Sequence, residues 1–156
     1  MKKIKYLIFS VLAISMICYI FSACTCIRRN YNEVFFTNWG IELPESKKEL
    51  FRKSDDHFHG DGVRYAVFLL DETPEELISD FFKEKNDELE SFVNDRLLEA
   101  DFSVPEKYLP QWDKSYCWKR IDIYKDHKPG LEITEKHCCM IYFPEDLILS
   151  ICQYYY

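Results

Sequence analysis

Several stretches of the chain carry the hydrophobic pattern of β-strands. Residues 63–70 are β-branched and aromatic with apolar side chains on both faces, and they follow the turn signal Gly60-Asp61-Gly62. We therefore expect a central strand there. Three further strand patterns near the C-terminus are separated by short connections, which predicts an antiparallel meander of residues 116–124, 135–143 and 147–154.

Residues 74–99 carry the pattern of one long amphipathic helix. Thr73 suits an N-cap, Pro74 suits the first helical position, and Glu76 completes a capping box. Apolar residues recur at helical spacing and stay in register across the polar stretch 83–88. We expect one apolar stripe that packs on the sheet, made of Leu77, Ile78, Phe81, Phe82, Leu89, Phe92, Val93 and Leu97.

The order of elements predicts an α+β fold, with an antiparallel β-sheet packed against one long α-helix and preceded by a signal or anchor segment. Residues 33–37 and 49–53 would add strands before the central one. By length and composition, we divide the chain into a signal peptide (1–23), a tether (24–32) and a single α+β domain (33–156).

The N-terminus predicts export from the cytoplasm. Three lysines among the first five residues precede residues 6–23, which hold no charged side chain, as in a secretory signal peptide. Phe21-Ser22-Ala23-Cys24 resembles the cleavage motif of bacterial lipoproteins, with Phe where Leu, Val or Ile is usual. The resemblance implies that Cys24 carries lipid, such as palmitate, and that the mature protein faces the extracytoplasmic side of the cell membrane.

Two other readings of this segment stay open. Residues 6–25 are long enough to span a bilayer as an uncleaved anchor. Ordinary cleavage and release is the third reading. All three place the mature domain outside the cytoplasmic membrane.

The charge of the chain restricts its partners. The first 23 residues hold three lysines and no acid, so the remainder has 17 basic and 27 acidic side chains, a net charge of −10. Nucleic acid and anionic lipid would be repelled. The expected partners are therefore the membrane, through lipid on Cys24, and an unknown protein or small ligand. The sequence indicates no cofactor.

The chain has seven cysteines, four of which lie in the late strand patterns. A disulfide is permitted outside the cytoplasm, and these four allow three complete pairings. Cys138 and Cys139 are adjacent on one strand, so they point to opposite faces. The disulfide candidates are Cys117, Cys138, Cys139 and Cys152.

One dense polar cluster offers candidate metal ligands. His57 and His59 would project to the same side of an extended segment, and Asp61 could add an oxygen ligand. The segment partly resembles the metallo-β-lactamase motif, but Gly62 stands where that family needs histidine. Cupins also use paired histidines on a strand, but the glutamate that they require shortly afterwards is missing here. We favour a hairpin turn. Phe58-His59-Gly60-Asp61-Gly62 also resembles a stretch in small bacterial proteins of unknown function, often lipoproteins. This resemblance covers residues 40–70 and implies no activity.

Three functional hypotheses follow from these patterns. The first is a non-enzymatic, membrane-anchored binding or accessory lipoprotein. The second is an immunity-type lipoprotein that protects against a toxin, since an acidic domain suits a basic toxin. The third is a small metal-dependent enzyme that uses His57, His59 and Asp61.

Overall fold

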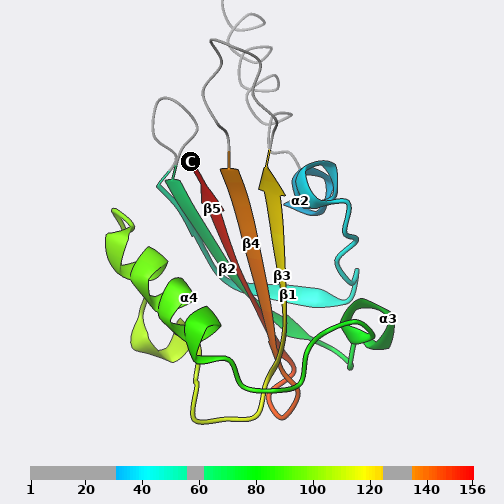
Figure 1. Cartoon of the computed structure of the whole chain (residues 1–156). Coiled ribbons are helices and arrows are strands. Elements are labelled where there is room, and N and C mark those ends of the chain that lie inside the picture. The colour runs from blue at the N-terminus through cyan, green and yellow to red at the C-terminus, as the bar shows by residue number, and fades with distance from the viewer. Residues whose placement is uncertain (1–30, 56–61, 125–134) are drawn as a thin grey trace, which may run out of the picture. The chain divides into compact units, whose positions relative to one another are not determined.

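The computed structural model describes residues 31–55, 62–124 and 135–156. The chain divides into two compact units, Met1–Glu42 and Leu43–Tyr156. The second unit is built on a five-stranded antiparallel sheet, so the α+β class is as predicted (Figure 1). Its elements are β1 (Lys47–Ser54), β2 (Gly62–Leu70), α3 (Glu75–Ile78), α4 (Asp87–Glu99), the 3₁₀ helix η1 (Glu106–Tyr108), β3 (Cys117–Tyr124), β4 (Glu135–Phe143) and β5 (Ile148–Tyr155).

The strand order is β1-β2-β5-β4-β3. The last three strands form the predicted meander, and β5 returns beside β2, far away in the sequence. β2 therefore has a neighbour on each side, as its two apolar faces predict. The edge strand β1 is mostly charged and carries a bulge between Glu49 and Phe51. Charges and bulges protect an exposed edge from pairing with other chains.

Helix α4 covers one face of the sheet (Figure 1). Leu89, Val93 and Leu97 recur at helical spacing and are buried. They pack in one cluster with side chains that alternate along three strands. The strand members of this cluster are Val63, Tyr65, Val67, Cys139, Ile141, Phe143 and Cys152.

The prediction of one long helix over 74–99 is wrong. α3 ends at Ile78 and α4 begins at Asp87. Between them, the backbone of Phe82 exchanges two hydrogen bonds with Trp118 on the free edge of β3, at 2.8 and 2.9 Å. Asn86 then caps α4, because its side-chain oxygen accepts a bond of 2.9 Å from the amide of Leu89. Pairing with the sheet edge therefore replaced the middle of the expected helix.

The predicted capping box at Thr73 is also absent. The N-cap of α3 is Pro74, which makes no side-chain cap hydrogen bond. The hydroxyl of Thr73 instead accepts a long hydrogen bond of 3.4 Å from Tyr142 on β4. The side chain of Thr73 thus contacts the sheet and does not make the helix cap that the local pattern predicted.

The strand predicted over residues 33–37 is wrong as well, since this segment lies in helix α2 (Tyr31–Trp39) of the first unit. Tyr31 and Phe35 are one helical turn apart, and their rings stack with centroids 5.8 Å apart. Gly40 ends the helix with a φ of +68° and donates a 2.7 Å bond to the carbonyl of Phe36. The four-residue aromatic spacing outweighed the β-propensity of Val34-Phe35-Phe36.

Candidate functional site

The predicted lipid and metal residues lie outside the described residues. This applies to Cys24, His57, His59 and Asp61, whose roles stay predictions. Within the described ranges, no three or more His, Cys, Asp or Glu side chains gather as a metal site. No helix in these ranges is both long and apolar enough to cross a membrane.

The four disulfide candidates lie buried in the sheet and carry free thiols. The strand register places Cys139 opposite Cys152 beneath α4. Cys138 lies on the opposite face, together with Cys117. Burial raises the pKa of Cys139 to about 12 and the pKa of Cys152 well above its usual range. Thiols with a high pKa are poor nucleophiles, so these side chains serve packing.

A polar and aromatic cluster lies where β3 and β4 pair, on the sheet face beneath α4. Nδ1 of His137 lies 2.6 Å from Oδ1 of Asp122, and Nε of Arg120 donates to the same oxygen at 2.9 Å. The ring of Tyr154 stacks on the imidazole at 6.0 Å. Phe92 of α4 meets the imidazole edge-on at 5.7 Å. The cluster therefore joins three strands and the helix.

The charges of this cluster compensate one another. Burial opposes ionisation of Asp122, but the hydrogen bonds from His137 and Arg120 outweigh it and lower the pKa of that carboxyl. The second imidazole nitrogen, Nε2, faces Oε2 of Glu135 at 3.7 Å. An Asp–His pair in a hydrolase needs a hydroxyl or thiol at that nitrogen, and this one faces a carboxylate. The arrangement therefore suits a structural ion-pair network.

Sequence reasoning missed this network, although part of its signal was present. Arg120 and Asp122 are two residues apart on a strand, so they share a face. Only the β3–β4 register places Asp122 opposite His137. That register connects residues 15 positions apart, and the local pattern does not specify it.

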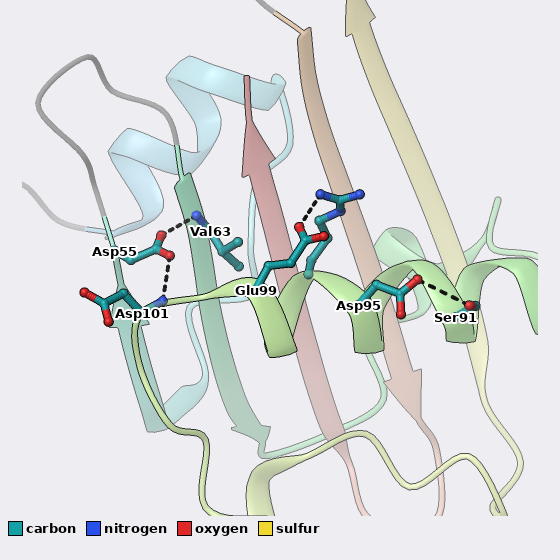
Figure 2. Close-up of polar contacts among 7 residues, drawn as sticks. Asp55, Val63, Ser91, Asp95, Glu99 and Asp101 are labelled. Atoms are coloured by element: carbon teal, nitrogen blue, oxygen red, sulfur yellow. Dashed lines mark hydrogen bonds and ion pairs between the residues drawn. The ribbon is translucent and has the colours of Figure 1, made fainter.

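The negative charge of the protein is concentrated in and before α4. Residues 71–101 contain twelve acids and three basic residues, a net charge of −9. Asp95 and Glu99 are exposed on α4, and Figure 2 shows Asp95 accepting a hydrogen bond from Ser91 at 3.4 Å. Excess charge on an exposed surface attracts partners of opposite sign.

An apolar groove opens beside this acidic surface, between the end of α4 and the loop that follows it. Its volume is about 540 Å³, within the range of ligand-binding pockets. The most exposed apolar side chain on its wall is Leu98, at 83%. The lining residues are Asn94, Leu97, Leu98, Ala100, Phe102, Ser103, Val104 and Leu109.

The loop side of the groove is held in place by Asp55, as Figure 2 shows. One carboxylate oxygen accepts from the amide of Val63 and the other from the amide of Asp101, the latter at 3.1 Å. Gly62 permits this contact, because a Cβ there would lie 2.6 Å from the carbonyl oxygen of Asp55. The end of β1, where the β1–β2 connection begins, therefore fixes the start of the loop after α4.

Comparison of the chain with protein-family models, with curated proteins and with solved structures finds no match. The candidate site therefore rests on geometry and charge alone. Of the features described, the apolar groove at the end of α4 is the one open to a partner, since the cysteines are buried and the histidine cluster is internally paired.

Proposed function

We propose that this protein is a bacterial lipoprotein, held at the extracytoplasmic side of the cell membrane by lipid on Cys24. The observation that carries this proposal is the N-terminal sequence: a basic start, an uncharged apolar run and Phe21-Ser22-Ala23-Cys24. One acyl chain gives only marginal membrane binding. Stable anchoring therefore requires at least two chains, as lipoprotein processing supplies.

We further propose that the domain is a non-enzymatic binding module. Support comes from the uneven distribution of charge, with a net charge of −9 in residues 71–101. The apolar groove beside α4 adds a concave surface to these charges. The buried thiols have raised pKa values, and the Asp122–His137 pair faces a carboxylate. These features favour recognition over catalysis.

The anchoring proposal is tested with Cys24→Ala in the full chain, and Cys26→Ala is the matched control. We expect Cys24→Ala alone to abolish incorporation of an alkyne-labelled fatty acid and to shift the protein out of the detergent-extractable membrane fraction. If Cys24→Ala stays in that fraction with residues 1–23 intact, the protein is held by an uncleaved anchor and the lipid proposal is wrong. If the parent is released without fatty acid, ordinary signal cleavage is correct.

A second candidate function is protection against a toxin, which the acidic segment at residues 71–101 favours because a basic toxin would complement it. A toxin gene beside the gene for this chain, and survival of toxin-expressing cells only when the chain is coexpressed, would support this role. Equal survival with and without the chain would remove it.

A further inference from the structure

We propose that the groove at the end of α4 binds a basic segment of a partner protein whose apolar side chains enter the groove between flanking lysines or arginines. This inference rests on the proposed binding function and names its surface and its kind of partner. The carrying observation is the combination of an apolar groove of about 540 Å³ with exposed acids beside it.

The wall of the groove is suited to apolar side chains. Leu97 forms its buried floor beside the core, whereas its neighbour Leu98 stands 83% exposed at the wall. Phe102 and Val104 contribute from the loop and are each half-buried. An apolar residue from a partner would remove surface on Leu98, Phe102 and Val104 from water, which favours association.

The groove is preorganised by hydrogen bonds from outside it. Asp55 holds the amide of Asp101 at 3.1 Å, and the indole of Trp112 donates to the side-chain oxygen of Asn94 at 3.0 Å. Lys85 donates to the backbone carbonyl of Trp112 at 2.7 Å. A surface that is ordered before binding loses less conformational entropy when a partner docks.

The charges around the groove select the sign of the partner. Four exposed acids flank the lining residues in sequence, namely Asp95, Glu99, Asp101 and Glu106. Of the two basic residues in the same stretch, Arg96 forms an ion pair with Glu99 and lies over the ring of Tyr154 at 4.4 Å, and Lys107 lies over Tyr108 at 4.7 Å, so Asp95, Asp101 and Glu106 make up the excess of acid. The excess of acid attracts a cationic segment.

The same charges argue against the other occupants of an apolar groove. An anionic lipid surface would meet the acids beside Leu98, and repulsion would oppose insertion. A second copy would bring its own −9 segment against this one. A basic protein segment is the occupant that satisfies both the apolar wall and its flanking charges.

The test measures peptide binding to the full-length protein in discs of zwitterionic lipid, with empty discs as the blank. The probe is a fluorescent peptide in which lysines flank a Leu-Phe-Leu core. One control peptide replaces the core with serines, and a second replaces the lysines with glutamates. We expect the probe to bind about tenfold or more tightly than the serine control, since burial of one large apolar side chain is worth about that factor. We expect the glutamate control to bind more weakly than the probe, because its charges are repelled by the acids beside the groove.

Two sets of variants locate the site. We expect Leu98→Ser to weaken binding of the probe about tenfold, while Phe82→Ser, which changes an exposed apolar residue outside the groove, leaves binding unchanged. The pair Asp95→Asn with Glu99→Gln should weaken it about fivefold at low salt. The charge-matched control is Glu72→Gln with Glu75→Gln, which removes two exposed acids outside the groove lining and should weaken binding less. Thermal unfolding checks that every variant is folded.

Each contrary result overturns the inference. Equal binding of the serine control peptide would mean that charge alone acts, and unchanged binding by Leu98→Ser would place the peptide elsewhere. Dimerisation of the parent that Leu98→Ser abolishes would identify a second copy as the occupant. A protein that carries no fatty acid but still binds the probe would contradict only the anchoring proposal. A protein that carries lipid but does not bind the probe would contradict the present inference.

Discussion

The two faces of α4 have opposite environments although they are made by the same thirteen residues. The inner face places Leu89, Val93 and Leu97 in the core. The outer face exposes Leu98 at 83%, next to Leu97 at 8%. Two adjacent leucines therefore differ about tenfold in exposure. Their difference shows that an apolar residue in the sequence is evidence of burial only when its helical phase agrees.

The charges beneath and outside α4 differ in the same way. Beneath it, the carboxylate of Asp122 lies within hydrogen-bond distance of both Arg120 and His137. Outside it, Glu99 pairs with Arg96, but Asp95 bonds only a serine hydroxyl among the contacts drawn in Figure 2. Paired charges beneath the helix contribute to the fold, whereas excess charge on its outer surface is available to a partner.

The largest expected difference between the two faces is in thiol reactivity. We expect Cys139 to react with a small alkylating agent about a thousandfold more slowly than a cysteine introduced by Ser91→Cys, because the buried thiol reacts only when the structure opens. Mass spectrometry of the labelled peptides measures both rates. Labelling of Cys139 after unfolding should not require a reductant, and a requirement for one would show a disulfide in the exported protein.

The next difference is in stability. Leu89→Ala should lower the free energy of unfolding by about 2–5 kcal/mol, because it leaves a cavity in the core. Leu98→Ala is the matched substitution on the outer face and should change it by less than about 0.5 kcal/mol. Urea unfolding followed by circular dichroism measures both. Similar losses for the two variants would contradict the assigned phase of α4.

The start of α4 is tested by Asn86→Ala. Removing the cap should cost about 1 kcal/mol, since the amide of Leu89 loses its acceptor. Ser91→Ala, inside the helix, serves as the control and should have little effect. If one helix continued through Asn86, alanine would be stabilising at this position, so even the sign of the change distinguishes the two arrangements.

An effect no larger than that of the cap is expected for the paired charges. Asp122→Asn should destabilise the protein by about 1 kcal/mol near neutral pH, after allowance for partial solvent exposure. Because folding lowers the pKa of Asp122, its ionised carboxylate contributes stability at pH values above the ordinary pKa of 3.8. This contribution is lost as the pH falls through the lower pKa of the folded state. The parent should therefore lose more stability than the variant between about pH 5 and pH 3.

The control for this experiment is Asp95→Asn, which removes an exposed carboxylate on the outer face of α4. We expect it to change the free energy of unfolding by less than about 0.5 kcal/mol. The loss of stability between about pH 5 and pH 3 should run parallel to that of the parent. If the stability of Asp122→Asn also fell with pH in the same way as that of the parent, the β3–β4 network would contribute nothing to folding.

Strands were easier to predict than helices in this chain. The limits 135–143 match β4 residue for residue, and residues 63–70 match β2 to within one residue, because alternation along a strand is a local property. The helix over 74–99 failed because Phe82 found partners on β3, and residues 33–37 failed because Val34-Phe35-Phe36 fits either pattern. Long-range pairing is not encoded in a short window.

The candidate site was less predictable than the fold. The acids of residues 71–101 are plain in the sequence, but the groove needs the loop at Phe102 folded back toward α4 and fixed by Asp55, 46 residues away from Asp101. The histidine network needs the β3–β4 register in the same way. Such contacts arise from tertiary packing, so composition and spacing locate the charges and leave the concave surface undetermined.

The sequence by itself determined the strand pattern, the apolar stripe of α4 and the acidic charge, and it predicts export with lipid on Cys24. These properties depend on neighbours a few residues apart, through side-chain alternation, helical spacing and transfer from water. Only the tertiary structure decided where the helix breaks, which leucine of the Leu97–Leu98 pair is buried, and that apolar side chains beside the acids form a groove. Those outcomes depend on competition between distant backbone and side-chain partners, which no local pattern contains.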